Sequence, residues 1–89
     1  MNSEEILYCA KSDGFVKEFE TLWSKYPRKK NKKYALDYYI EARNNGVSFD
    51  TINEGIDKYK NYILVNGLDA EYIAIGSTWF RDYRWEDEY

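Results

Sequence analysis

A lysine-rich segment is the part of this sequence whose residue types and spacing best suit a binding chemistry. Residues 23–33 carry six positive charges and no carboxylate. Its cations are Lys25, Arg28, Lys29, Lys30, Lys32 and Lys33. The rest of the chain holds 7 basic and 16 acidic residues, a net charge of −9, whereas the whole protein has a net charge of −3. Clustered cations on an acidic body attract phosphates or acidic surfaces, so this segment is the first candidate for a binding site. The alternative is a solvated basic turn without a ligand.

The position of these charges along the chain strengthens the binding interpretation. Pro27 ends a helical pattern, because the residue before a proline is pushed out of the helical region. A new pattern opens near Asn31, which is a suitable N-cap. Lys32 and Lys33 then lie in a first helical turn, where the helix dipole disfavours each cation by roughly 0.3–1 kcal/mol. Because these cations are present despite their cost to helix stability, their position is consistent with a role in binding a ligand.

Other site chemistries find little support in the sequence. The chain has no histidine, so it lacks the usual general base at neutral pH and the commonest zinc ligand. Its single cysteine, Cys9, excludes an internal disulfide and is expected to pack as a small apolar residue. Glu54 and Asp57 lie on an ordinary polar helix face, and no glycine-rich phosphate loop is present. The sequence therefore predicts no enzyme activity, no metal and no cofactor.

Length and composition predict one small domain with an aromatic core. The 89 residues include ten Tyr, four Phe and three Trp, and 33% of the chain is charged, a globular composition. No apolar run reaches the roughly 18 residues of a membrane span, and the first residues lack the features of a signal peptide. We therefore expect a cytoplasmic protein without a membrane partner.

Hydrophobic spacing predicts two helices before the middle of the chain. The first is expected to start at an Asp13 N-cap and to run to about Lys25, after a short apolar cluster in residues 3–11. Its apolar residues fall on a single stripe. They are Phe15, Phe19, Leu22, Trp23 and Tyr26. The second helix is expected over residues 31–44, with Gly46 in the left-handed position after its end.

The third helix has the clearest start signal. Ser48 is the expected N-cap, and Val47 and Ile52 stand at the two positions of a hydrophobic staple. Gly55 inside this helix costs about 1 kcal/mol relative to alanine, so the close approach of another helix or an aromatic ring is expected there. Asn66 and Gly67 are expected to end the helix.

The C-terminal region is expected to form short helical segments. One short helix is expected over residues 69–73, followed by a helical turn capped by Ser77, and the chain is expected to fray beyond Trp85. The fold class is therefore all-α, a small bundle of three main helices plus a short C-terminal helical segment. The domain spans residues 1–89, with residues 1–12 and 86–89 peripheral. The predicted core consists of Phe15, Phe19, Trp23, Leu36, Tyr39, Ile52, Ile56, Tyr59 and Trp79.

The order and spacing of several short patterns resemble a known module. The first part reads Phe19-x-x-x-Trp23-x-x-Tyr26-Pro27-Arg28-Lys29, and Ile52-x-x-Gly55-Ile56-x-x-Tyr59, Ser77-Thr78-Trp79-Phe80 and Arg84-Trp85-x-Asp87 follow. Together they resemble the C-terminal domain of phage and prophage replication-initiation proteins, the replisome organisers, over about residues 15–87. The resemblance implies a helical domain that works at a replication origin and contacts single-stranded DNA, a helicase loader, or both.

Two functions follow as hypotheses. In the first, the domain binds single-stranded DNA: cations neutralise phosphates while exposed rings stack on bases. The residues expected to take part are Tyr26, Arg28, Lys29, Lys30, Lys32, Lys33, Tyr34, Arg81, Arg84 and Trp85. Trp79 is a further stacking candidate, although packing over Gly55 or Ile56 is the preferred interpretation for its ring. In the second, the domain is a small phage protein-interaction module that inhibits a host replication or defence protein, since exposed Tyr, Trp and Arg also suit protein interfaces.

Overall fold

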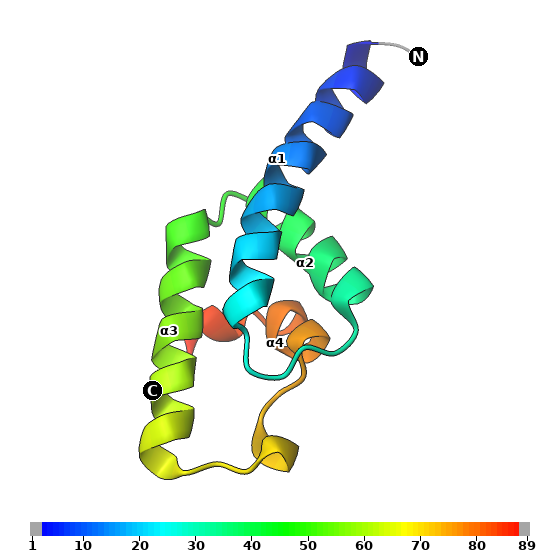
Figure 1. The fold of residues 1–89 in the computed structure, drawn as a ribbon. Coiled ribbons are helices and arrows are strands. Elements are labelled where there is room, and N and C mark those ends of the chain that lie inside the picture. Colours follow the sequence, from blue (N-terminus) through cyan, green and yellow to red (C-terminus); the bar gives the residue numbers. More distant parts are fainter. Residues whose placement is uncertain (1–2, 88–89) are drawn as a thin grey trace.

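The computed structural model describes residues 3–87, and side chains from Gly14 to Asp87. Within this part the chain forms six helical elements and no strand (Figure 1). They are α1 (Ser3–Lys25), α2 (Lys32–Asn44), α3 (Phe49–Asn66), the 3-10 helix η1 (Ala70–Tyr72), α4 (Gly76–Arg81) and the 3-10 helix η2 (Arg84–Glu86). The predicted all-α class, with three main helices and short helical pieces after them, is confirmed.

Helix α1 is longer than the sequence predicted. It begins at Ser3 and continues through Asp13 without a break, so the prediction of a helix start at Asp13 is wrong. No proline lies between Ser3 and Lys25, and the single glycine there, Gly14, costs only about 1 kcal/mol. Residues 3–11, expected as a separate cluster, are therefore the first turns of α1. This half of the helix extends beyond the other helices (Figure 1).

Helices α2 and α3 begin and end near the residues that the sequence predicts, but the Asn31 side chain does not cap α2. Ser48 caps α3, and its hydroxyl accepts a hydrogen bond from the Thr51 amide at 3.1 Å. Gly46 and Gly67 take the predicted left-handed conformation after the two helices, with φ of 92° and 60°. Asn31 stands at the N-cap position of α2, but its side chain does not cap the helix. Its amide instead donates to the Ser77 hydroxyl at 3.4 Å, which links the start of α2 to α4.

The core is mostly aromatic, and its residues come from α1, α2, α3, α4 and η2, together with Tyr26 just after α1. The fully or nearly fully buried apolar residues are Phe19, Leu22, Trp23, Tyr26, Ala35, Tyr39, Ala42, Ile52, Ile56, Tyr59, Trp79, Phe80 and Trp85. Seven of the nine predicted core residues are among them, and the other two, Phe15 and Leu36, are half-buried against this core. Trp79 lies in the middle, with its ring centroid 5.2 Å from that of Phe80 and 5.6 Å from that of Trp85.

Two glycines allow these rings to approach a helix backbone. A Cβ atom added to Gly55 would lie 2.7 Å from the Cα of Trp85 and closer still to its Cβ, and 3.4 Å from Cη2 of Trp79. The predicted aromatic neighbour of Gly55 is therefore confirmed. A Cβ added to Gly76 would collide with the ring of Trp23. Helix α4 begins at Gly76, with Ile75 as N-cap, so the predicted cap at Ser77 is wrong: Ser77 is buried inside the helix.

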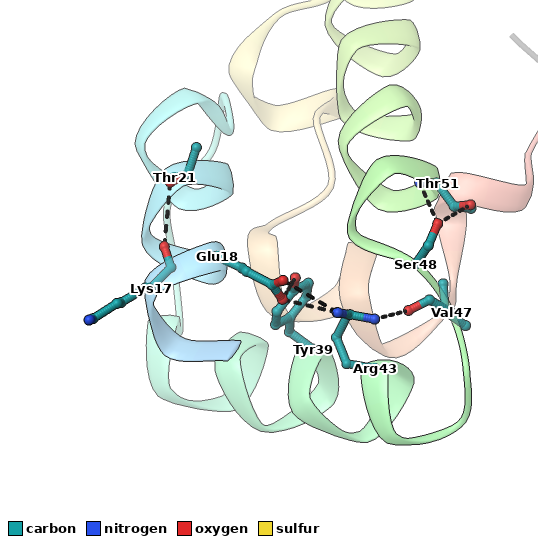
Figure 2. Close-up of polar contacts among 8 residues, drawn as sticks. All are labelled: Lys17, Glu18, Thr21, Tyr39, Arg43, Val47, Ser48 and Thr51. Carbon is teal, nitrogen blue, oxygen red and sulfur yellow. Dashed lines mark hydrogen bonds and ion pairs between the residues drawn. The ribbon is translucent and has the colours of Figure 1, made fainter. Parts of the chain in front are cut away.

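A half-buried polar cluster joins α1 to α2 and to the turn before α3 (Figure 2). The guanidinium of Arg43 donates to both carboxylate oxygens of Glu18, at 3.0 and 3.3 Å. The Tyr39 hydroxyl donates to the same carboxylate at 2.8 Å, and Arg43 also donates to the Val47 carbonyl at 3.0 Å. The Phe15 ring lies 4.8 Å below the guanidinium carbon. The Glu18 carboxylate thus links α1 to α2, and α1 carries the first residues of the lysine-rich segment.

Glu18→Gln is expected to lower the free energy of unfolding at pH 7 by about 1–2 kcal/mol, because charge-assisted hydrogen bonds are lost. Burial raises the pKa of Glu18, but the hydrogen bonds from Arg43 and Tyr39 and the charge of Arg43 outweigh it and hold the pKa below its ordinary value of 4.5. The charged carboxylate therefore stabilises the fold above pH 4.5, and this contribution is lost as the pH falls through the lower folded pKa.

Urea unfolding of wild type and Glu18→Gln at pH 7 and pH 3 measures this effect, with the difference expected to shrink at pH 3. Glu20→Gln is the matched control, since Glu20 forms only an exposed pair with Lys32 and should change stability by less than about 1 kcal/mol. A Glu18→Gln difference that is equal at the two pH values would contradict the role given to the carboxylate.

Candidate nucleic-acid interface

The lysine-rich segment occupies the end of α1, the loop of residues 26–31 and the first turn of α2. Its loop is held in place by the segment before α4. The Gly76 amide donates to the Arg28 carbonyl at 3.0 Å, and the Arg28 guanidinium donates to the Ile73 carbonyl at 2.9 Å. The Tyr26 hydroxyl donates to the Ala74 carbonyl at 2.7 Å. The loop is thus a fixed platform docked on residues 73–76, which Figure 1 shows running beside it.

Half of the six cations in this segment serve the fold. Lys25 forms an ion pair with Asp57 of α3 at 2.6 Å, and Lys32 forms one with Glu20 of α1 at 2.9 Å. The Arg28 guanidinium is half-buried on the Ile73 carbonyl. The carboxylates therefore offset the charges of Lys25 and Lys32, whereas Arg28 keeps its charge but uses part of its guanidinium to hold the loop.

The other three cations are available to a ligand. The side chains of Lys29, Lys30 and Lys33 are exposed and form no ion pair or hydrogen bond with any residue between 14 and 87. Tyr34 follows Lys33 directly, at the start of α2, and its side chain is 61% exposed. Three unneutralised ammonium groups and one open ring thus come from six consecutive residues, an arrangement that can contact phosphates and one flat base or side chain.

Two of the aromatic residues expected in the site lie in the core instead. Tyr26 is fully buried, and its ring packs 5.8 Å from that of Trp79. Trp85 is 7% exposed and covers Gly55. The preferred interpretation of Trp79 is confirmed, since its side chain is also fully buried. The prediction that Tyr26 and Trp85 present their rings for base stacking is therefore wrong, and Tyr34 is the one exposed ring among the four stacking candidates.

The two arginines expected to extend the basic surface are engaged by carboxylates. Arg81 donates two hydrogen bonds to its neighbour Asp82, at 2.9 and 3.3 Å, and these bonds hold the pKa of Asp82 below its ordinary value. Arg84 pairs with Asp87 at 3.0 Å, and its guanidinium carbon lies 5.5 Å from the centroid of the Tyr59 ring. Neighbouring negative charge offsets both arginines, so neither extends the free positive charge of the loop.

An apolar hollow next to the loop was not anticipated from the sequence. It has a volume of about 370 Å³. Its lining residues are Pro27, Lys60, Asn61, Ile63 and Leu64. The run Ile63-Leu64-Val65 is the sequence signal that could have revealed it. Successive residues on a helix point about 100° apart, so one narrow core contact cannot bury all three.

Two other features are absent from the described residues. The side chains described between residues 14 and 87 include no group of three or more acidic or cysteine residues that could hold a metal ion, and no helix within residues 3–87 has the length and apolar character needed to cross a membrane.

Comparison with known protein families gives a match over most of the chain. The family model of the Legionella vir region protein LvrA C-terminal domain matches residues 15–83, from the second half of α1 to the residues after α4. No curated protein and no solved structure matches the chain. The matched region contains the whole lysine-rich segment and Tyr34, and it covers well over half of the sequence. The chain therefore belongs to the family of the Legionella vir region protein LvrA C-terminal domain.

Proposed function

We propose that this domain is a phage-type accessory module of DNA replication, acting in the cytoplasm, that contacts single-stranded DNA through Lys29, Lys30, Lys33 and Tyr34. The observation that carries the proposal is a set of three exposed lysines without a carboxylate partner among the described residues: Lys29 and Lys30 on the loop fixed by Arg28 and Gly76, and Lys33 in the first turn of α2. The replication setting rests on the sequence resemblance to the C-terminal domain of replisome organisers.

The expected binding is weak and indifferent to base sequence. Each phosphate that a lysine neutralises releases counterions, which supplies affinity without reading a base. Stacking of one base on the Tyr34 ring would add about 1–3 kcal/mol. The net charge of −9 outside the lysine-rich segment repels the strand wherever it leaves the loop. One short contact, covering a few nucleotides, is the mode that this charge distribution favours.

Replacing Lys29, Lys30 and Lys33 with Gln is expected to flatten the salt dependence of oligonucleotide binding. Three phosphate contacts at about −0.7 each predict a slope of roughly −2 for log affinity against log salt in the wild type. The variant should give a slope near zero and an unchanged melting temperature, because these side chains hold no partner in the fold. A fluorescent single-stranded oligonucleotide titrated at several salt concentrations measures both slopes.

The matched control removes three exposed lysines elsewhere, by Lys17, Lys58 and Lys60→Gln. It changes the net charge equally and should retain most of the salt slope. Indistinguishable titrations for wild type and the Lys29, Lys30 and Lys33 variant would rule out the DNA contact. Equal losses in both triple variants would instead indicate attraction by overall charge.

A protein-interaction module is the second candidate function, with a helicase loader or an inhibited host protein as the partner. The observation that favours it is the exposure of two large apolar residues at the end of α3, Leu64 at 80% and Val65 at 74%. A purely protein-binding domain predicts no affinity for the oligonucleotide at any salt concentration, so the same titration separates the two candidates.

A further inference from the structure

The last turns of α3 present an apolar face that no part of residues 14–87 covers. Ile63 packs against the core, whereas Leu64 and Val65 point elsewhere and are mostly exposed. Single exposed apolar residues are common on protein surfaces, but grouped ones mark interaction sites. Tyr62, 38% exposed, adds a further apolar side chain to the same turn.

This exposed turn borders the apolar hollow. Lys60, Asn61, Ile63 and Leu64 line it from α3, where Ile63 follows Lys60 by three residues and Leu64 follows Asn61 by three and Lys60 by four, so neighbouring turns of the helix contribute to one side. Pro27 closes the opposite side from the loop of the lysine-rich segment. The loop that carries Pro27 is held by the hydrogen bonds of Arg28 to Gly76 and Ile73.

Both elements that line the hollow carry lysines. Lys60 of α3 is a lining residue, and its side chain is exposed, so its stem borders the hollow while its ammonium group can reach solvent beside it. Lys29 and Lys30 follow Pro27 by two and three residues, so their Cα atoms lie within roughly 8 and 11 Å of that of Pro27. Their side chains are exposed and unpaired, and a lysine stem is long enough to reach a ligand seated at this distance.

We propose that the hollow binds an amphipathic protein segment that inserts a large aliphatic side chain beside Leu64 and places carboxylates against Lys60 and the loop lysines. This inference extends the second candidate function, and it shares Lys29 and Lys30 with the proposed DNA contact, but the apolar hollow itself plays no part in that contact. Helix-in-groove recognition uses this combination of an apolar anchor and flanking charges.

The same charges argue against two other occupants. In a symmetric contact between two copies, each residue set faces itself, so Lys60 and the loop lysines would meet lysines. Nucleic acid is disfavoured because bases stack on aromatic rings, and the lining of the hollow contains none. An acidic, amphipathic protein segment satisfies both the apolar lining and the positive charge.

The probe is a fluorescein-labelled alanine-based helical peptide with leucines at i, i+3 and i+7 and flanking glutamates. Its counterpart carries lysine in place of every glutamate. The acidic peptide is expected to bind the full chain, and the basic one at least tenfold more weakly at low salt. Fluorescence anisotropy measures both. No binding of the acidic peptide, or equal binding of the two, would overturn the proposal.

Matched variants locate the contact. Leu64→Ser is expected to weaken the acidic peptide roughly ten- to hundredfold, because a large aliphatic contact is lost, whereas the exposed Tyr72 lies outside the lining and Tyr72→Ser should have no effect. Lys60→Glu should weaken binding at low salt more than Lys58→Glu, on the same helix but outside the lining. Peptide binding unchanged by Leu64→Ser would place the contact elsewhere.

Two further measurements keep this proposal separate from the DNA contact and from self-association. Leu64→Ser should retain its melting temperature and wild-type oligonucleotide affinity, since Leu64 is exposed and belongs to neither the core nor the lysine-rich segment. Sedimentation should show a monomer for wild type. A wild-type dimer that Leu64→Ser dissociates would overturn the proposal in favour of a second copy as the occupant.

Discussion

Trp79→Ala is expected to lower the free energy of unfolding by about 3–5 kcal/mol, the largest effect of any substitution considered for this chain. The Trp79 side chain is fully buried and meets the ring of Tyr26, just after α1, and rings from α3, α4 and η2. Its removal leaves a cavity at the point where these elements join, and a small domain cannot collapse around a hole of that size. For 89 residues, whose total stability is of the order of 4–13 kcal/mol, this loss is a large share.

Trp79→Phe is the informative comparison. The indole Nε1 of Trp79 is buried and has no hydrogen-bond partner among the described residues, and an unpaired buried donor costs roughly 1–3 kcal/mol. Phenylalanine keeps a ring in the core and removes that donor, so it should cost clearly less than alanine. Urea unfolding followed by circular dichroism gives both values. Equal losses for Phe and Ala would contradict a role based on ring packing.

Gly55→Ala is expected to destabilise the domain by about 1–3 kcal/mol, although alanine favours a helix by about 1 kcal/mol over glycine. The new Cβ would collide with Trp85, whose Cα lies 2.7 Å away, and a backbone atom cannot move aside as a side-chain tip can. Gly55→Leu adds three more carbons to the same site and should cost more. Thermal and urea unfolding both test this.

Gly14→Ala is the matched control for Gly55→Ala. Both glycines lie inside long helices, but around Gly14 no described side chain and no other element comes within 4 Å of the position that a Cβ would take. Alanine there should stabilise by about 0.5–1 kcal/mol. The same chemical change is thus expected to have opposite signs at the two positions. A Gly55→Ala variant that melts at or above wild type would show that the contact with Trp85 is not tight.

Local sequence signals determined most of the helical framework. Ser48 and Gly67 bound α3 at the predicted places, and Gly46 takes its left-handed position after α2, because a cap depends on residues three or four positions away. The apolar stripes of α1 and α3 identified Phe19, Ile52 and most of the core, because a helical repeat also depends only on residues three or four positions apart. The start of α1 was misplaced because Asp13 is a good cap, while the turns before it extend the helix at little cost.

Tertiary structure alone decided which aromatic residues near the C-terminus are buried. Trp85 and Phe80 belong to helical pieces too short to show a period, so no pattern could tell their buried side from their exposed side. Trp85 is buried because Gly55, thirty residues earlier, gives it room. Tyr26 ends the α1 stripe, but its hydroxyl needed the distant Ala74 carbonyl before the ring could be buried.

The candidate binding site was likewise determined partly by the sequence and partly by tertiary structure. The sequence by itself determined that six cations gather between Lys25 and Lys33 on an otherwise acidic chain. Which of them remain free depended on helix packing, because Asp57 and Glu20 lie on α3 and α1 and come within ion-pair distance of Lys25 and Lys32 only in the folded chain. Lys29 and Lys30 lie on the loop that docks on Ile73 and Gly76, and Lys33 lies in the first turn of α2; all three are exposed and form no ion pair with a described carboxylate.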